Sequence, residues 1–309
     1  MDADLDTLAT ALYATVDDLL KAHPEQCPPR PASGFQPQTS DAELITMAVI
    51  QALLQIPKER RFWRYARTHL TGLFPHQPSQ SAYNRRLRAL ASTMAWLVAT
   101  LATMVSVISD DVWLVDSTPV ECGRSRETAK RSDLVGWAEY GYCASHSRYF
   151  WGLRLHMITT VHGLPIVWML TGAQADEREV LATMLTRVPP DLAERIRASL
   201  RRQILMSDKG YQSRPLESAL THDGIEMIRP AKTNEAPRPG AAFLKPMRQI
   251  IESVFDTLKD QLDLERHAAR TPGGVTARIA TRILALTTVI WHNDRIGAPV
   301  LRSLTAYDH

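Results

Sequence analysis

The sequence of 309 residues is poor in cysteine and in long apolar runs. Its three cysteines, Cys27, Cys122 and Cys143, are odd in number and scattered, which fits a reducing compartment better than a disulfide framework. The N-terminal stretch MDADLDTLAT lacks the basic and apolar regions of a signal peptide, and no run approaches the roughly 18 apolar residues of a spanning helix. We therefore expect a cytoplasmic protein with no membrane partner.

Clustered ligands for a soft metal are also scarce. Cys143 and His146 have the spacing of metal ligands, but two residues do not make a zinc site. The composition is 45% apolar, which is enough to bury one large core or two moderate ones. We expect a globular protein without structural zinc.

Acidic residues are nearly absent from one segment. The net charge is only +3, but between residues 58 and 88 a single acid, Glu59, accompanies eight bases: Lys58, Arg60, Arg61, Arg64, Arg67, Arg85, Arg86 and Arg88. This segment predicts contact with a polyanion, and arginines near the start of one of several short helices resemble helix-turn-helix DNA binding in outline. We assign Arg85, Arg86 and Arg88 to DNA binding. The alternative is an ordinary helical bundle with a basic solvent-facing surface.

The hydrophobic pattern changes near residue 105. Residues 1–105 have the pattern of amphipathic helices, interrupted by a proline-rich linker at 24–38 and followed by a helix that Ser40 or Asp41 would cap. From about residue 110, short β-rich runs alternate with helical ones. We expect a DNA-binding helical region over 1–105, a mixed α/β sheet flanked by helices over 106–292 with an insertion at about 120–148, and a tail over 293–309.

Turn and cap residues mark the elements of the α/β region. The run VWLVDSTPV reads as a buried strand that ends at Asp116, and a second apolar run ends just before Asp208. The remaining signals are a hairpin around His162 and Gly163, a helix capped by Asp176, and a helix opened by Ser213 and Pro215 and closed by Gly224.

Three acids form the candidate active site. In open α/β sheets, functional residues gather at the carboxyl ends of strands, where this reading places Asp116 and Asp208. Either aspartate alone is as readily explained as the cap of a turn. Together with Glu252 on a downstream helix, they supply three hard oxygen ligands for two Mg²⁺ or Mn²⁺ ions that would hold a phosphodiester.

Glu252 lies on a helix with two distinct faces. Its apolar stripe is Met247, Ile250, Ile251, Val254, Phe255, Leu258 and Leu262. The charged ridge carries Arg248, Glu252, Asp256 and Lys259, spaced four, four and three residues apart. Taken alone, this ridge fits a solvated ladder of salt bridges. Beside two strand-end aspartates, it fits a carboxylate presented to metals, with Arg248 and Lys259 placed to receive phosphates.

The insertion at about 120–148 is basic and aromatic together. Its cations Arg124, Arg126, Lys130 and Arg131 would follow a DNA backbone, and Trp137, Tyr140 or Tyr142 would stack on an unpaired base. Aromatic residues also serve as core packing, which is the alternative here. On the next strand, Arg154 and His156 alternate with leucines and share the non-core face, so we assign them to active-site support rather than to a solvated face.

The motifs LVDSTPV, SDKGY and IESVFDTLKDQLDLERHAART occur in this order, together with YGYCASHSRYFWG and IWHN. In these blocks, in SDAELITMAVIQALL and in the ending SLTAYDH, the chain resembles the DDE transposases of bacterial insertion sequences, specifically the insertion-sequence family numbered 982. The resemblance implies a ribonuclease-H-like core with Asp116, Asp208 and Glu252 as catalytic and metal-binding acids. It also implies two divalent metals, DNA of the element ends and of the target as partner, and a homodimer in the synaptic complex.

A related group of insertion-sequence transposases, the one numbered four, carries a tyrosine, arginine, glutamate and lysine signature around its closing acid. Arg248, Glu252 and Lys259 match that spacing, whereas Lys245 occupies the tyrosine position. A lysine side chain offers only charge at this position, so Lys245 is a DNA-binding candidate, and the sequence leaves the route of second-strand cleavage, by a hairpin or otherwise, open.

We therefore expect a transposase that binds element ends, cleaves DNA and joins the freed 3′ end to a target. The alternatives are a nuclease of the same core without strand transfer, and an inactive relic that only binds its former ends.

Overall fold

The protein is described by a computed structural model that covers residues 3–30, 37–143, 147–199, 201–231, 235–236, 238–300 and 304. His146 and most of the ending SLTAYDH lie outside these residues. The chain divides into two compact units. The helical unit contains the chain up to Leu101 and the segment Thr257–Pro299, and the sheet unit contains Ala102–Asp256.

The helical unit is built mainly from amphipathic helices, as the sequence pattern predicts. The helices are α1 (Ala3–Ala22), η1 (Pro24–Gln26), α2 (Asp41–Leu53), α3 (Glu59–His69), α4 (Gln80–Ala89), α5 (Ala91–Thr103), the π-helical turn η5 (Thr257–Gln261), η6 (Leu264–Arg266) and α11 (Pro272–Arg295). At α2, Ser40 is the cap and forms a capping box with Glu43, which satisfies two backbone N–H groups at the start of the helix.

Helix α11 is the central helix of this unit and packs against α1, α2 and α4. By length and composition alone it would be long enough to cross a membrane, but 78% of its most apolar stretch is buried inside the protein. Within it, Arg282 is buried and donates to the carbonyl oxygens of Asp263 and Arg278. The sequence pattern assigned residues up to 292 to the sheet region. The structure instead groups 257–299 with the N-terminal helices, because α11 buries its apolar faces against them.

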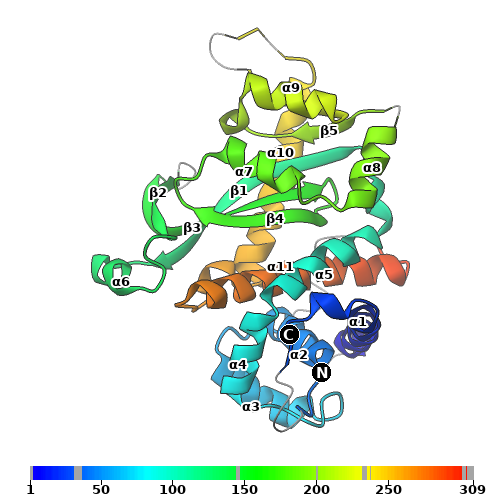
Figure 1. The fold of residues 1–309 in the computed structure, drawn as a ribbon, viewed down its shortest axis with the longest axis vertical. Helices are drawn as coiled ribbons and strands as arrows, with labels where there is room; N and C mark the ends of the chain where they lie inside the picture. The colour runs from blue at the N-terminus through cyan, green and yellow to red at the C-terminus, as the bar shows by residue number, and fades with distance from the viewer. Residues whose placement is uncertain are drawn as a thin grey trace. The chain divides into compact units, whose positions relative to one another are not determined.

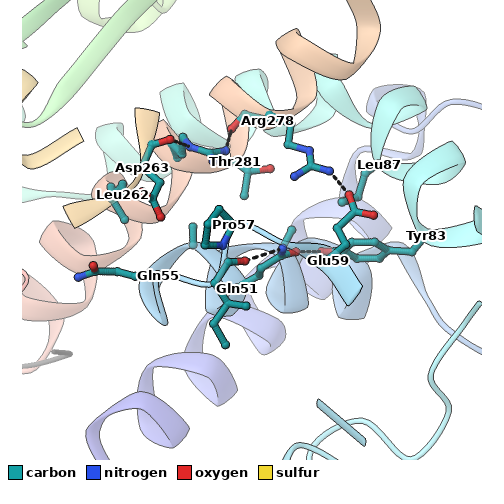
Figure 2. Close-up of a pocket in the computed structure, with 14 residues that line it drawn as sticks. Gln51, Gln55, Pro57, Glu59, Tyr83, Leu87, Leu262, Asp263, Arg278 and Thr281 are labelled. Atoms are coloured by element: carbon teal, nitrogen blue, oxygen red, sulfur yellow. Dashed lines mark hydrogen bonds and ion pairs between the residues drawn. The ribbon is translucent and has the colours of Figure 1, made fainter. Parts of the chain in front are cut away.

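Glu59, the only acid in the basic segment, points into the helical unit. Glu59 is 8% exposed and accepts a hydrogen bond from Arg278 on α11 (Figure 2). It also accepts hydrogen bonds from Gln80 and Asn84 on α4. Beside it, the Tyr83 hydroxyl donates to Gln51. Glu59 therefore ties three helices together, and the surface of α3 is left with cations.

The sheet unit carries a six-stranded mixed sheet. Its strands are β1 (Val112–Gly123), β2 (Glu139–Cys143), β3 (Arg148–Thr160), β4 (Pro165–Gly172), β5 (Gln203–Met206) and β6 (Ile225–Ile228). Its helices are η2 (Ser106–Ser109), α6 (Arg126–Arg131), α7 (Glu177–Leu185), α8 (Pro190–Ala198), η4 (Lys209–Tyr211), α9 (Arg214–His222) and α10 (Ala241–Asp256). In Figure 1, α7 lies in front of the sheet and α10 passes behind it. The predicted mixed α/β sheet flanked by helices is confirmed.

The sheet combines antiparallel and parallel pairs in the order β2, β3, β1, β5, β6, with β4 also on β3. β3 pairs antiparallel with β1, β2 and β4, whereas β1, β5 and β6 are parallel. β2 and β4 share one edge of β3: β2 pairs with residues 148–152 and β4 with residues 153–159. The predicted hairpin at Gly163, which has a φ of 82°, and the caps Asp176 and Ser213 are confirmed.

β1 is longer than its sequence pattern indicates. The apolar run predicts a strand that ends at Asp116, but β1 continues through Pro119 to Gly123. The parallel pairing with β5 ends at Leu114, and beyond it β1 pairs only with β3. Proline is tolerated there because a strand with one partner has a free edge for the position without an N–H group. Asp116 therefore lies inside β1 but just past the end of the parallel ladder.

Helix α10 has the predicted apolar face, since Ile251, Val254 and Phe255 are buried. It begins at Ala241, earlier than the charged ridge indicates, and it accommodates Pro246. Its regular geometry ends at Asp256, where the π-helical turn begins. The spacing of about 100° per residue therefore does not extend to Lys259, and the expectation that Lys259 leaves the same face as Glu252 loses its geometric basis.

Arg86 of α4 has a structural role in the helical unit. Its guanidinium makes a bidentate ion pair with Asp41, through Nε at 2.9 Å and a terminal nitrogen at 2.7 Å, and it donates to the carbonyl oxygens of Pro28 and Pro29. Burial raises the pKa of Asp41, but the hydrogen bonds and charges of Arg86 and Arg30 more than offset this and hold it below its ordinary value. Arg86 thus connects the proline-rich linker to α2. Because its guanidinium is occupied by these contacts, we no longer count Arg86 among the DNA-binding candidates.

Replacing Arg86 by alanine should lower the free energy of unfolding by about 3 kcal/mol, because Asp41 would keep only Arg30 as a partner in a largely buried position. Arg88→Ala, on the exposed surface of the same helix, is the matched control and should stay within about 0.5 kcal/mol of the parent. Urea unfolding followed by circular dichroism measures both. Equal stability of the two variants would contradict the structural role.

Candidate active site

The two aspartates meet because of the register between β1 and β5. The last parallel pair joins Leu114 to Met206, and Asp116 and Asp208 each lie two residues beyond it. Side chains two residues beyond a matched pair lie on the same side of both strands, at neighbouring positions. The carboxylates therefore lie next to each other where the parallel ladder ends. This is the edge at which the sequence places the candidate site, although Asp116 is inside its strand.

Each aspartate accepts a backbone hydrogen bond. The Ser117 N–H donates to Asp116 Oδ1 at 2.7 Å, and the Gly210 N–H donates to Asp208 Oδ1 at 2.7 Å, which makes Asp208 the cap of η4. Burial raises the pKa of Asp116 to about 7, and the negative charges of Asp208 and Glu177 contribute to the rise. The Ser117 N–H and the Arg248 charge oppose it. The site thus concentrates negative charge that a cation would neutralise.

Helix α10 faces the aspartates with Arg248. Asp116, Asp208 and Arg248 line one small pocket together with apolar residues of β1, β5 and α10. Glu252 is one turn further along α10, half exposed, and accepts a hydrogen bond from Arg248 Nε at 2.8 Å. The structure therefore brings Asp116, Asp208 and Arg248 together, and it pairs Glu252 with Arg248.

In the part of the chain that the structure describes, no three acids, histidines or cysteines are grouped closely enough to hold a metal. The donor chemistry nevertheless suits Mg²⁺ or Mn²⁺, since both aspartates offer carboxylate oxygens and are already adjacent. Glu252 makes an exposed ion pair with Arg248, four residues earlier, and such pairs contribute about 0.3–0.5 kcal/mol. Breaking this ion pair would therefore cost little.

A further acid, Glu177, supports the pair from the opposite side of the sheet. Ser117 and Arg154, on β1 and β3, point toward α7, where both donate to Glu177 Oε1 at 2.9 Å and 3.2 Å. Arg154 also donates to Ser117 Oγ and to the carbonyl oxygen of Tyr142. Burial and the charge of Asp208 raise the pKa of Glu177, and the Ser117 hydrogen bond and the Arg154 charge oppose that rise. The predicted role of Arg154 near the site thus has a geometric basis.

Gly210 in the SDKGY motif is required by this packing. A Cβ atom on Gly210 would lie 2.3 Å from Glu177 Oε2 and 3.0 Å from Asp208 Oδ1. Only glycine lets the turn that carries Asp208 approach the Glu177 carboxylate so closely. Sequence reasoning missed Glu177 because an acid in the first turn of a helix is ordinary, and only the packing of α7 shows what it contacts.

His156 does not lie on an open face. It is fully buried, and its Nε2 is 3.0 Å from Thr171 Oγ1. Burial, together with the Arg154 charge, lowers its pKa to about 4, so it is neutral at physiological pH. The face that it shares with Arg154 is covered, which the alternation with leucines cannot reveal. His156 is therefore part of the core beneath the site.

The remaining candidates for DNA contact are spread over both units. Arg85 and Arg88 are exposed on α4, and Lys245 is exposed on α10. Four cations in and beside α6 are also exposed, although three of them pair weakly with Glu121 or Glu127: Arg124, Arg126, Lys130 and Arg131. Lys259 is half-buried in the π-helical turn of the helical unit.

A mixed α/β sheet whose parallel edge carries adjacent aspartates is a suitable scaffold for metal-assisted chemistry on phosphodiesters. Residues 109–288, more than half of the chain, match the family described as the transposase DDE domain. The chain belongs to this family.

One similar curated protein is a putative transposase for the insertion sequence element IS402 from Burkholderia cepacia, 30% identical over 77 residues. The match spans 25% of this chain and 36% of that protein. Among solved structures, the chain is similar to the piggyBac transposase in a synaptic complex with hairpin DNA, with a TM-score of 0.46 and 11% identity. That match covers 97% of this chain and 76% of the other.

Replacing Arg154 by alanine should lower the stability of the sheet unit by about 2 kcal/mol. The change leaves Glu177 and Ser117, both half-buried, without their shared cation. The stability of Arg154→Lys should lie between those of the wild type and Arg154→Ala, because lysine restores the charge but not the forked geometry. Thermal unfolding measures the difference, with Arg131→Ala, whose side chain is 83% exposed, as the control. A loss no larger than that of the control would show that the cluster is not structural.

Proposed function

We propose that this protein is a transposase that binds the ends of its insertion element, cleaves DNA with divalent metals and joins the freed 3′ end to a target. The observation that supports this most directly is the adjacency of Asp116 and Asp208 at the end of the parallel ladder, in a chain that belongs to the transposase DDE domain family. Similarity to the insertion-sequence transposase from Burkholderia cepacia favours the same activity.

The proposed metal site consists of Asp116, Asp208 and Glu252. Two divalent ions would activate the attacking water or 3′-hydroxyl and stabilise the leaving oxygen. In this proposal the two aspartates hold the ions at the edge of the sheet, and Glu252 exchanges Arg248 for metal. Arg248 is then free to pair with a phosphate beside the scissile bond, which suits a guanidinium.

We infer further that the sheet unit has a ribonuclease-H-like core. Its order of three antiparallel strands followed by two parallel ones, β1, β3, β4, β5 and β6, supports this assignment. Membership of the insertion-sequence family numbered 982, a homodimeric synaptic complex and a cytoplasmic location remain parts of the same proposal. The sequence motifs alone support the family membership and the homodimer, and the scattered cysteines support the location.

The helical unit is proposed to bind the element ends. Along α3, Arg60, Arg64 and Arg67 recur every three or four residues, so they share one exposed face. The segment's single acid, Glu59, is buried against Arg278 and does not neutralise them. With Arg85 and Arg88 on α4, which packs beside α3, these residues supply a cationic surface for phosphates.

Asp116→Asn, Asp208→Asn and Glu252→Gln should each reduce Mg²⁺-dependent cleavage at least about a hundredfold, since about 2.7 kcal/mol of transition-state stabilisation corresponds to that factor. The substrate is a duplex that carries the DNA segments flanking the coding sequence in its host. Cleavage is followed on denaturing gels, and duplex binding, measured separately in EDTA, should be retained.

Asp256→Asn is the matched control, because Asp256 is an exposed acid on the same helix as Glu252. It should cleave at the wild-type rate. Normal cleavage by any of the three variants would remove that residue from the metal site. A second assay supplies pre-cleaved ends and a plasmid: joined products support a transposase, whereas cleavage without joining supports a nuclease.

Replacing Arg64 and Arg67 by alanine should weaken duplex binding and reduce its dependence on salt. Each lost phosphate contact should lower the slope of log Kd against log salt by about one. Fluorescence anisotropy at several salt concentrations measures the slope. A double variant with Arg187→Ala and Arg197→Ala, at two exposed positions of the sheet unit, is the control because it loses the same two charges. An unchanged slope in the α3 variant would show that the basic face of α3 does not contact DNA.

A further inference from the structure

An exposed pair of tyrosines lies on β2 and β3. Tyr142 and Tyr149 are directly opposite each other in the antiparallel register. Their ring centroids are 5.0 Å apart and the ring planes are inclined by 56°. Tyr142 is 47% exposed and Tyr149 is 79% exposed, which is the largest exposure among the bulky apolar side chains that the structure describes. Two adjacent exposed aromatic rings form a contiguous apolar patch, and such patches often mark interaction sites.

The pair lies on the same face of the sheet as the first catalytic candidate. Asp116 is opposite Met157 on β3, and opposite residues of an antiparallel pair project to the same side. Tyr149 is eight residues from Met157 along β3, so the alternation of side chains places both on one face. At about 3.3 Å per residue, Tyr149 and Met157 are separated by about 26 Å along the strand. This distance is less than the roughly 34 Å of one turn of duplex DNA.

Helix α6, which carries exposed cations, packs against the face that bears the tyrosines. A Cβ atom on Gly123 would lie 3.1 Å from Thr128 of α6 and 3.2 Å from Trp151, which neighbours Tyr149 on the same face. Helix α6 therefore packs over the tyrosine-bearing face, at the end of the sheet where β2 lies (Figure 1). The exposed Arg126 and Lys130 project from α6. Positive charge next to exposed aromatic rings is the combination that binds single-stranded nucleic acid.

We propose that Tyr149, braced by Tyr142, is a stacking site for an unpaired base of the DNA on which the protein acts. The proposal rests on the proposed function only in that the chain binds DNA, and it does not depend on cleavage. Bases inside a duplex are covered by their neighbours, so an exposed ring can reach only a base at a frayed, nicked or displaced end.

The ring geometry assigns different roles to the two tyrosines. A base between two rings needs about 7 Å, twice the stacking rise of about 3.4 Å per base in DNA. The centroid separation of 5.0 Å leaves no room for insertion, so a base would stack on the outer ring, Tyr149. Tyr142 would hold that ring in place. This predicts that Tyr149→Ala loses more binding than Tyr142→Ala measured in the same assay, a difference that a purely electrostatic surface would not produce.

The test uses the full chain in EDTA with a single-stranded oligothymidylate that contains one 2-aminopurine, whose fluorescence is quenched when it stacks on an aromatic ring. Tyr149→Ala should abolish most of the quenching and weaken binding about tenfold. Tyr149→Phe and Tyr149→Trp should retain both, because each keeps an aromatic face. Tyr142→Phe should resemble the wild type. Tyr13→Ala, on α1 of the helical unit, is the control with a moderately exposed tyrosine at 37% and should change nothing.

Unchanged quenching and affinity in Tyr149→Ala, with an unaltered melting temperature, would overturn the proposal. So would a shift in sedimentation from dimer to monomer with DNA binding intact, because the tyrosines would then form a protein interface. Asp116→Asn should keep the wild-type quenching. A protein that does not cleave but shows quenching dependent on Tyr149 would disprove the proposed catalysis and leave this site in place. A protein that cleaves but shows quenching independent of Tyr149 would disprove this site and leave the proposed catalysis in place.

Discussion

Three residue pairs between β1 and β5 determine where the functional residues of this protein lie. The short parallel ladder ends at Leu114 and Met206, and the two aspartates follow at matched positions on both strands. A slip of one residue would turn Asp116 to the other face, where Ser117 now lies. The register therefore decides which side of the sheet carries the paired carboxylates, and with it which helix can complete the site.

The acidic side chains on the two faces of the sheet have different surroundings. On one face, Asp116 and Arg248 of α10 line a small pocket. On the other face, Glu177 accepts hydrogen bonds from Arg154 and Ser117 and packs against Gly210, so its carboxylate has a structural role. Glu177 packs against the turn that carries Asp208, and this packing helps to hold the adjacent aspartates in place despite their mutual repulsion.

Several charged side chains in this chain form buried ion pairs that stabilise the fold. Burial distinguishes them from the exposed cations nearby in the sequence. Arg86 and Arg88 are two residues apart on α4, yet Arg86 binds Asp41 and the linker carbonyls while Arg88 is exposed. Similarly, Glu59 is drawn inward by Arg278, although its neighbours on α3 are exposed arginines. A partner distant in sequence decides each case, which is why a count of charges along the segment overestimates the exposed cations on α4 and underestimates the positive charge exposed on α3.

The sequence by itself determined the local elements and supplied the candidate acids of the site. Caps at Ser40, Asp176 and Ser213, the turn at Gly163 and the apolar face of α10 depend on neighbouring residues, and the chain carries those signals in short stretches. The tertiary structure alone decided the length of β1, the burial of His156, the role of Glu177, the end of α10 at a π-helical turn and the pairing of Tyr142 with Tyr149. These features arise from strand register and from helices packed on a sheet, where the residues in contact are far apart in sequence and no local pattern encodes their distance.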